Sequence, residues 1–357
     1  MAKKEAKKKA KNIIISKSAS QSQKKDRFKV AINGFGRIGK QFFLACMNAN
    51  VPWDFVINNS SPVEYIVYEL KYDSIHEVPK EKALHDGKYL YFGDKKIRVY
   101  NELDAQKLPW KSEGVDLVVD CTGMFTHREE AMQHIKAGAK KVLISAPAKN
   151  PDATIVPGVN ENSLLPEHII VSAGSCTTNC IAPIVKILND HYKIKNCSFV
   201  TTHAYTSTQK LIDGIDKKEL RRGRAAANEI VPSTSGASQS VVEAIPELKG
   251  KIEGYALRVP VADGSISSVF AEVESKVNAK QVNELFKKMS EKNYNNILQY
   301  TSDPIVSADI LGNPSSVIID SGLTSVNGNI ISVAGWYDNE IGYSNRLMDV
   351  AKLVLSK

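Results

Sequence analysis

The chain has 357 residues, of which 43% are hydrophobic, and this size and composition suit two soluble domains with cores of their own. No run approaches the roughly 18 apolar residues of a membrane helix, and residues 13–15 are the only apolar segment near the N-terminus, too short for a secretory signal. The five cysteines are odd in number and form no C-x-x-C pair, so we expect neither disulfides nor a metal site, and a cytoplasmic location.

The formal net charge of +8 is concentrated in one segment. Residues 1–25 contain nine Lys and one Glu, so the rest of the chain is neutral overall. This low-complexity segment is predicted to be a disordered tail. A solubilising extension is the simpler interpretation of its lysines, and weak contact with RNA or anionic surfaces is the second.

A glycine-rich stretch follows the first predicted strand. Residues 28–33 read as a β-strand, residues 34–39 are Gly-Phe-Gly-Arg-Ile-Gly, and the next apolar residues repeat with the period of a helix. In a strand–GxGxxG–helix unit the glycines let the backbone turn and approach a pyrophosphate, and the helix N-terminus faces the anion. The context therefore predicts a dinucleotide-binding loop.

Further strands of the same type follow along the chain. Residues 55–58, 115–120 and 141–147 are apolar runs, which are typical of parallel strands buried on both faces. Ligands bind beyond the carboxyl ends of such strands, so we expect Ser145 to line the cofactor crevice. Where an acid would hold the adenosine ribose, the sequence has Asn59.

The stretch around Cys176 indicates a nucleophile. Residues 169–171 read as a strand, residues 173–175 as a tight turn, and Thr177 onward as a helix, so Cys176 is expected at a helix N-terminus. The backbone N–H groups there favour the thiolate and can stabilise a nearby oxyanion. The residues alone leave a second interpretation open, because Cys176 and Cys180 could equally be small core residues.

The remainder predicts a second domain with a mostly antiparallel sheet. A strand over residues 196–202 ends beside His203, which is either a structural histidine or a base for a cysteine nucleophile. A helix is predicted over residues 278–292. The other predicted strands span residues 255–259, 265–273, 316–320 and 330–334.

Four separated motifs resemble one family. The hexapeptide Ser-Cys-Thr-Thr-Asn-Cys at 175–180 is similar to the active-site signature of phosphorylating glyceraldehyde-3-phosphate dehydrogenases. The loop Asn-Gly-Phe-Gly-Arg-Ile-Gly, the segment at 202–209 and Trp-Tyr-Asp-Asn-Glu at 336–340 agree with it in order and spacing. The resemblance covers about residues 28–355. It implies an α/β fold, with a Rossmann-type dinucleotide-binding domain (26–174 and 339–357) and an α+β catalytic domain (175–338).

The resemblance also assigns residues to roles. Cys176 would attack the aldehyde of glyceraldehyde 3-phosphate, and His203 would act as the base; hydride transfer and attack by inorganic phosphate would then give 1,3-bisphosphoglycerate. The implied cofactor-binding residues are Gly34, Phe35, Gly36, Arg37, Ile38, Gly39, Asn59, Thr122, Gly123, Ser145, Asn339 and Tyr343. The implied ligands of the substrate phosphate and of inorganic phosphate are Ser175, Thr177, Thr206, Thr208, Ser235, Gly236 and Arg258.

Two departures from the family pattern concern the cofactor. Members restricted to NAD usually have Asp where this chain has Asn59, and many have Pro where it has Ile215. Both departures favour acceptance of NADP beside NAD. The family likeness further implies a homotetramer in which the loop at 209–227 crosses a subunit interface.

Two other functions stay open at this stage. An erythrose-4-phosphate dehydrogenase of the same superfamily would carry similar motifs. A nucleic-acid-binding protein acting through residues 1–25, with vestigial catalysis, is the alternative from another class. The hydroxyls of Thr206, Thr208 and Ser235 favour phosphorolysis, and the intact Cys176 and His203 favour an active enzyme.

Overall fold

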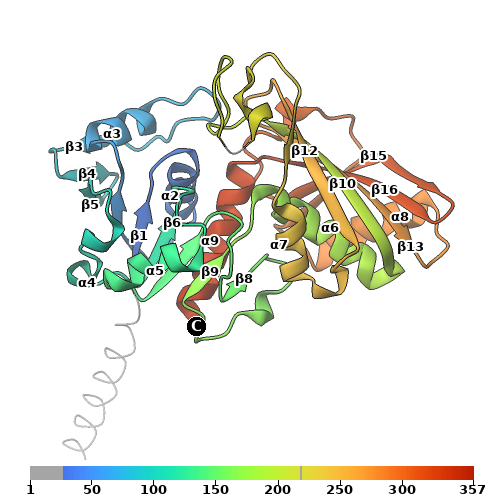
Figure 1. Ribbon diagram of the computed structural model, residues 1–357, viewed down its shortest axis with the longest axis horizontal. Coiled ribbons are helices and arrows are strands. Elements are labelled where there is room, and N and C mark those ends of the chain that lie inside the picture. The colour runs from blue at the N-terminus through green and yellow to red at the C-terminus, as the bar shows by residue number, and fades with distance from the viewer. Residues whose placement is uncertain (1–26, 218) are drawn as a thin grey trace, which may run out of the picture.

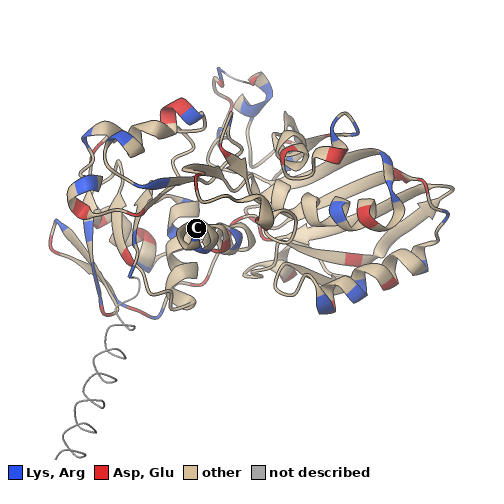
Figure 2. Ribbon diagram, turned by 90° about the horizontal axis from the view of Figure 1, so that it is seen from below, with Lys and Arg blue, Asp and Glu red and all other residues tan. Residues whose placement is uncertain are grey.

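The computed structural model describes residues 27–217 and 219–357, which form two lobes, each built on one β-sheet (Figure 1). The predicted tail of residues 1–25 and the interpretations of its lysines lie outside the described residues. Within them, no helix is long and apolar enough to cross a membrane. Basic and acidic residues are interspersed over both lobes (Figure 2), as expected for a folded region whose charges cancel.

In the described chain, the first sheet has nine strands in the order β3-β4-β5-β2-β1-β6-β7-β9-β8. The strands are β1 (Lys29–Asn33), β2 (Asp54–Asn58), β3 (Ala83–His85), β4 (Tyr89–Phe92), β5 (Lys95–Tyr100), β6 (Leu117–Asp120), β7 (Lys141–Ile144), β8 (Ala153–Thr154) and β9 (Ile170–Ser172). Both neighbours of β1 run parallel to it, and Asn33 at its end lies beside Asn58 and Asp120. The chain therefore reverses its direction of travel across the sheet at β1, which creates a crevice at the carboxyl ends of these strands.

Helices cover both faces of this sheet, as the continuous apolar runs predict. They are α2 (Arg37–Asn48), α3 (Val63–Lys71), α4 (Trp110–Glu113), α5 (Arg128–Lys136) and the C-terminal α9 (Ile341–Ser356). The core on one face joins α2, α3 and α9, and the core on the other contains Trp110 and Ala131. Leu347 and Val350 of α9 are fully buried there, so the last helix packs on the first lobe.

The second sheet, again within the described residues, has seven strands in the order β11-β12-β10-β13-β16-β15-β14. They are β10 (Ile194–Ala204), β11 (Val231–Thr234), β12 (Ile252–Val259), β13 (Ser265–Val273), β14 (Leu298–Thr301), β15 (Val317–Asn327) and β16 (Ile330–Tyr337). Four of the six pairings are antiparallel, which confirms the predicted type of sheet. The prediction ended β15 at Asp320; the strand continues after an irregularity there, over exposed residues without apolar alternation.

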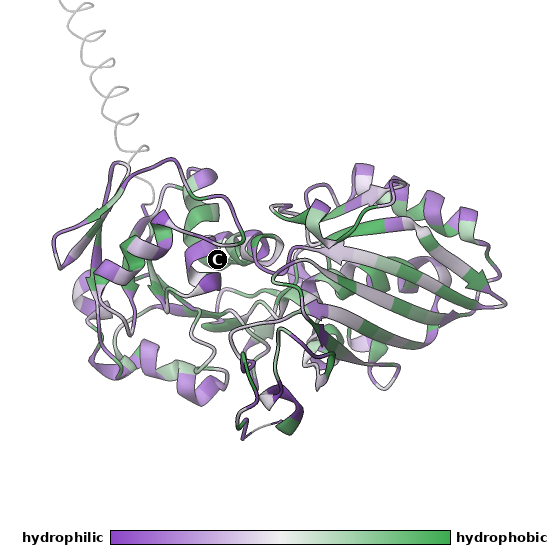
Figure 3. Ribbon diagram, turned by 90° about the horizontal axis from the view of Figure 1, so that it is seen from above, coloured by the Kyte–Doolittle hydropathy of each residue, from purple (hydrophilic) through white to green (hydrophobic). Residues whose placement is uncertain are grey.

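Helices pack on one face of the second sheet. They are α6 (Cys176–Tyr192), α7 (Ala237–Ala244) and α8 (Ala279–Lys292). The helix α6 runs through Pro183 unbroken, and the apolar residues Val282 and Phe286 of α8 are buried. Along β13 buried residues alternate with partly exposed ones, among them Phe270, so the opposite face of this sheet is open in the single chain (Figure 3).

Candidate active site

The glycine loop after β1 has the backbone that a dinucleotide requires. Gly34 has a φ of +89°, and a Cβ there would lie 2.9 Å from Cγ2 of Thr122. A Cβ on Gly39 would lie 2.0 Å from the carbonyl oxygen of Gly34, so only glycine lets α2 pack this closely on the loop. Gly36 faces open space, because no atom lies within 4 Å of a Cβ placed there. This opening at the N-terminus of α2 fits the pyrophosphate of NAD.

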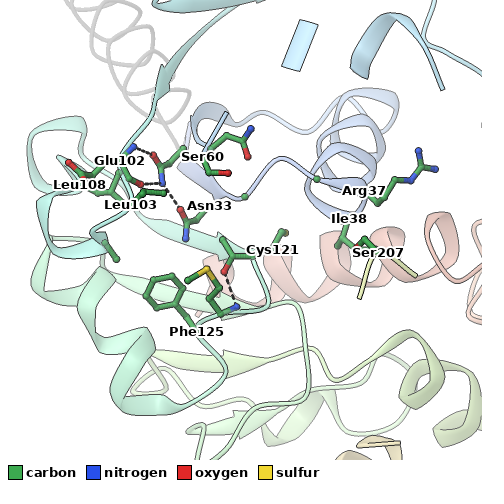
Figure 4. Close-up of a pocket in the computed structure, with 17 residues that line it drawn as sticks. Asn33, Arg37, Ile38, Ser60, Glu102, Leu103, Leu108, Cys121, Phe125 and Ser207 are labelled. Atoms are coloured by element: carbon green, nitrogen blue, oxygen red, sulfur yellow. Dashed lines mark hydrogen bonds between the residues drawn. The ribbon is translucent and has the colours of Figure 1, made fainter. Parts of the chain in front are cut away.

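A cavity of about 480 Å³ continues from this loop along the carboxyl ends of the strands (Figure 4). The sequence-predicted residues that line it are Gly34, Gly36, Arg37, Ile38, Asn59 and Thr122. The side chain of Phe35 is buried in the core instead, with its ring 5.8 Å from that of Phe43. Gly123 and Ser145 follow the last residues of β6 and β7 at the same edge of the sheet.

The adenosine end of the cavity is partly acidic. The Oδ1 atom of Asn59 accepts a hydrogen bond from the backbone N–H of Phe35 at 3.1 Å. A neutral amide therefore occupies the position at which an acid would hold the adenosine ribose. Glu102 nevertheless lines the same cavity, and its backbone N–H donates to Oδ1 of Asn58 at 3.0 Å (Figure 4). An acidic residue therefore lines this end, although not at the predicted position.

Several residues that line the cavity were not predicted from the sequence. Leu103, Met124 and Phe125 belong to loops with no periodic pattern, and Ser207 comes from the second lobe. Ser207 could have been suspected, because it stands between Thr206 and Thr208 in a motif already singled out. The second lobe thus contributes directly to the cofactor cavity.

The structure places Cys176 as predicted, at the first residue of α6. Ser175 caps this helix, since its Oγ accepts a hydrogen bond from the backbone N–H of Thr178 at 3.0 Å. Asn179 holds the preceding turn by donating from Nδ2 to the carbonyl oxygens of Ala173 and Ser175, both at 2.9 Å. The first backbone N–H groups of a helix have no carbonyl acceptor within it, and the backbone of Thr177 is hydrogen-bonded to the Cys176 sulfur.

Cys176 lies beside His203, at the end of β10. The Sγ atom is 3.3 Å from Nε2 of His203, which is within hydrogen-bonding reach. Strand pairing sets His203 directly opposite Arg258 of β12, and Nη1 of Arg258 is 2.6 Å from Nδ1 of His203. The same Nδ1 lies 2.7 Å from the carbonyl oxygen of Ala204, so the guanidinium and this carbonyl compete for one ring nitrogen.

The surroundings disfavour both charged forms of the pair. Burial raises the pKa of the Cys176 thiol, an effect that the charge of Arg258 opposes. Burial, reinforced by Arg258, lowers the pKa of His203 to about 3. With Arg258 in this position the resting pair is a neutral thiol and a neutral imidazole at pH 7, and displacement of the guanidinium would favour proton transfer to the ring.

A chain of hydrogen bonds connects this pair to the two motif residues near the C-terminus. The hydroxyl of Ser265 accepts from the backbone N–H of Ala204 at 3.1 Å and donates to Oδ1 of Asn339 at 2.6 Å. The amide nitrogen of Asn339 is thus the atom left for a ligand. Tyr343 donates from its hydroxyl to the carbonyl oxygen of Gly174 at 2.9 Å, which braces the turn before Cys176.

The predicted phosphate ligands form two groups. The hydroxyls of Thr206 and Thr208 lie 2.8 Å apart just after β10, close in the chain to His203. Thr177 lies 3.1 Å from the hydroxyl of Tyr337, and Ser235 accepts from the first backbone N–H of α7. A Cβ on Gly236 would lie 3.4 Å from Pro147, so this turn contacts the loop after β7 of the first lobe.

This combination of a dinucleotide-type cavity on a parallel sheet and a Cys–His pair on a second domain is typical of an oxidoreductase that uses a dinucleotide and a cysteine. A family model described as the NAD binding domain of glyceraldehyde 3-phosphate dehydrogenase matches residues 28–128, and the model of its C-terminal domain matches residues 175–339. The chain belongs to the glyceraldehyde-3-phosphate dehydrogenase family, and its reaction is the NAD-dependent oxidative phosphorylation of glyceraldehyde 3-phosphate.

Curated relatives agree along nearly the whole chain. Glyceraldehyde-3-phosphate dehydrogenase 2 of Streptomyces avermitilis is 44% identical over 329 residues, which is 91% of this chain and 98% of that protein. Glyceraldehyde-3-phosphate dehydrogenase 1 of Bacillus subtilis is 43% identical over 331 residues, or 92% of this chain and 98% of that protein. The enzyme of Geobacillus stearothermophilus is 43% identical over the same length. Neither an erythrose-4-phosphate dehydrogenase nor a nucleic-acid-binding protein is favoured by these findings.

Proposed function

We propose that Cys176 is the nucleophile and His203 the base of the family reaction, and the 3.3 Å contact between Sγ and Nε2 at the N-terminus of α6 carries this proposal. Sγ attacks the aldehyde carbon while its proton passes to Nε2 of His203, and a C–S bond forms. The former carbonyl oxygen becomes an oxyanion, which accepts a hydrogen bond from the backbone N–H of Cys176. His203 returns the proton to complete a thiohemiacetal.

The second half of the reaction turns the thiohemiacetal into an acyl phosphate. NAD held by the glycine loop and Asn339 would supply the hydride acceptor. His203 takes the hydroxyl proton as the hydride leaves, and Cys176 then holds a thioester. An oxygen of inorganic phosphate attacks this thioester and the C–S bond breaks. 1,3-Bisphosphoglycerate then leaves, and the Cys176 thiolate is regenerated.

The phosphate-binding roles follow from position and chemistry. Arg258 and the hydroxyls of Thr206 and Thr208 gather near the end of β10, where a guanidinium and two hydroxyls suit the phosphate of the aldehyde. The remaining proposed ligands, for inorganic phosphate, are Ser175, Thr177, Ser235 and Gly236. The proposed cofactor contacts are the glycine loop, Thr122, Gly123, Ser145, Asn339 and Tyr343.

Replacement of Cys176 by Ser tests the mechanism. Turnover of glyceraldehyde 3-phosphate should fall by about a thousandfold or more, because a serine hydroxyl is a far weaker nucleophile. NAD binding, measured by protein fluorescence, should persist, since the cavity does not include residue 176. Near-normal turnover would refute the assigned nucleophile, and a loss of NAD binding would point to misfolding.

The use of NADP beside NAD is a further part of the proposal. Asn59 puts no charge at the ribose position, which supports acceptance of a 2′-phosphate, whereas Glu102 in the same cavity opposes it. The test is kcat/KM with each cofactor in the wild type, Asn59→Asp and Glu102→Gln. Asn59→Asp should lower NADP use and Glu102→Gln should raise it, each by about tenfold or more, with little change for NAD. Equal NADP kinetics in all three proteins would contradict the proposal.

A homotetramer fits the surface of the loop at 209–227. Leu211, Ile212, Ile215 and Leu220 are each at least 75% exposed in the single chain, and so large an apolar patch is typical of an interface. Analytical ultracentrifugation of the wild type and of Ile215→Asp tests this. The substitution should shift a tetramer toward smaller species; a monomeric wild type would contradict the proposal.

We further propose a dinucleotide-binding domain at 26–174 with 339–357 and a catalytic domain at 175–338. We also propose a cytoplasmic location and weak RNA contact through residues 1–25. The free state of all five cysteines supports a reducing compartment. Deletion of residues 1–25 tests the RNA contact. Kinetics should be unchanged while retention on RNA is lost, and retention that survives the deletion would contradict a role for the tail.

A further inference from the structure

A cluster of ionisable side chains is buried where the two lobes meet. His76 follows α3 in the first lobe, Asp263 lies between β12 and β13, and Asp338 follows β16. One ligand atom from each, the imidazole nitrogen of His76 and a carboxylate oxygen of each aspartate, lies within 4.8 Å of the others, and all three residues are buried. None of these side chains has a part in the proposed reaction.

Two carboxylate oxygens of this region face a single hydrogen-bond donor, the Nε2 atom of His76. Nε2 of His76 is 3.0 Å from Oε2 of Glu340, with which it is hydrogen-bonded, and 3.1 Å from Oδ2 of Asp263. A single ring hydrogen cannot serve both oxygens. The Asp263 side chain is fully enclosed, and its Oδ2 has no hydrogen-bond partner among the described residues. A buried carboxylate oxygen left without a donor is costly unless a proton or a cation compensates it.

The charges of the surrounding network point to a cation. Ion pairs connect the cluster to a wider set of four carboxylates and two permanent cations, which are Asp73, Asp263, Asp338, Glu340, Arg37 and Lys40. The four carboxylates outnumber the two permanent cations, so a divalent ion would be held among an excess of acidic groups.

The geometry suits such an ion. Metal–ligand bonds of about 2.0–2.2 Å place adjacent ligand atoms roughly 3.0–3.4 Å apart, which is close to the 3.1 Å between His76 and Asp263. A cavity of about 720 Å³, lined by His76, Glu77 and Gly312, gives access for an ion and room for bound water. Glu340 keeps its bond to Arg37 when the His76 proton leaves. One nitrogen and two carboxylate oxygens are ligands preferred by Mn²⁺ and Zn²⁺.

We propose that His76, Asp263 and Asp338 bind one divalent transition-metal ion between the two lobes. Asp338 keeps a lone pair on Oδ2 for the metal, although Oδ1 already accepts two backbone hydrogen bonds and Oδ2 accepts one. The ion links a loop of the first lobe to two segments of the second. It stabilises the contact between the two lobes beside Asn339 and has no part in the chemistry at Cys176.

Titration with Mn²⁺ tests the site, because Mn²⁺ has little affinity for thiols and does not compete for Cys176. The full-length protein is stripped with EDTA, and free Mn²⁺ is followed by electron paramagnetic resonance. We expect one Mn²⁺ per chain and a higher thermal midpoint in its presence. Asp263→Asn and His76→Gln should each weaken binding by at least about tenfold. Glu77→Gln, which removes a charge from the same cavity, should change the affinity by less than about twofold.

Two results would overturn the proposal. One is a wild-type protein that binds no stoichiometric Mn²⁺ at millimolar concentration, together with an Asp263→Asn variant that is more stable than the wild type without metal. This would show that a proton compensates the cluster. The other is Mn²⁺ binding that is equally strong in both ligand variants. Circular dichroism and NAD binding confirm that each variant is folded, and His76→Gln suffices if Asp263→Asn fails to fold.

Discussion

Arg258 should control the proton of the Cys176–His203 pair before substrate arrives. Its Nη1 lies 2.6 Å from Nδ1 of His203, which is buried, while Arg258 itself is half-buried. Two like charges about 4 Å apart repel by roughly 4 kcal/mol at an effective dielectric constant of 20, which is a factor of about 10³ in the protonation of the ring. The same guanidinium attracts a Cys176 thiolate, but it contacts the imidazole directly, so repulsion dominates.

Replacement of Arg258 by Gln should therefore make the Cys176 thiol reactive at lower pH while lowering the catalytic efficiency. Alkylation of Cys176 by iodoacetamide, measured between about pH 5 and 9, should reach its midpoint at least ~1 pH unit lower than in the wild type. The kcat/KM for glyceraldehyde 3-phosphate should fall, since a proposed ligand of the substrate phosphate is lost. Arg258→Lys, which keeps the charge, is the matched control and should retain a profile close to the wild type. An Arg258→Gln profile that is unchanged, or moves to higher pH, would refute this role.

Three further predictions concern the fold around the site. Gly36→Ala should keep the wild-type thermal midpoint and lose NAD affinity, whereas Gly39→Ala should cost about 1–3 kcal/mol of stability, because its methyl would meet a carbonyl oxygen at 2.0 Å; thermal melts with NAD titrations distinguish them. Although burial alone would raise the pKa of Asp152, two backbone N–H groups and Arg128 lower it, so its stabilisation is present above about pH 4 and fades below; Asn at this position should cost about 1–2 kcal/mol at pH 7 and much less at pH 3 in urea titrations. Tyr343→Phe should lower stability by about 1 kcal/mol in urea titrations, and it should slow the alkylation of Cys176 by iodoacetamide.

Local pattern was enough to predict most of the fold. The strand–GxGxxG–helix unit and the apolar runs at 115–120 and 141–147 predict a parallel sheet, because only strands buried on both faces lack polar alternation. No prediction covered β3, β4, β5, β8, β11 or β14, each of which has six residues or fewer. Of these, β3 and β4 pair only with each other and with β5. The extension of β15 beyond Asp320 was missed because its side chains are largely exposed there.

The site was predictable only where one motif carries the whole interaction. The cap of Ser175 and the position of Cys176 follow from six consecutive residues. The contact between Arg258 and His203 depends on the pairing of β10 with β12, which no local pattern reveals. Glu102 and the cluster of His76, Asp263 and Asp338 were missed for the same reason. The absence of a C-x-x-C spacing therefore says nothing of ligands brought together by the fold.

Ser265 illustrates how the fold aligns residues that the sequence keeps apart. It is 61 residues from Ala204 and 74 from Asn339, yet one hydroxyl joins both. The Ala204 backbone fixes the end of β10, and with it the ring of His203, while Asn339 is oriented toward the proposed nicotinamide position. Because a hydroxyl can accept from one partner while donating to the other, its two bonds set a single direction for the Asn339 amide. The proposed base and the proposed cofactor ligand are thus positioned by one side chain at the first residue of β13.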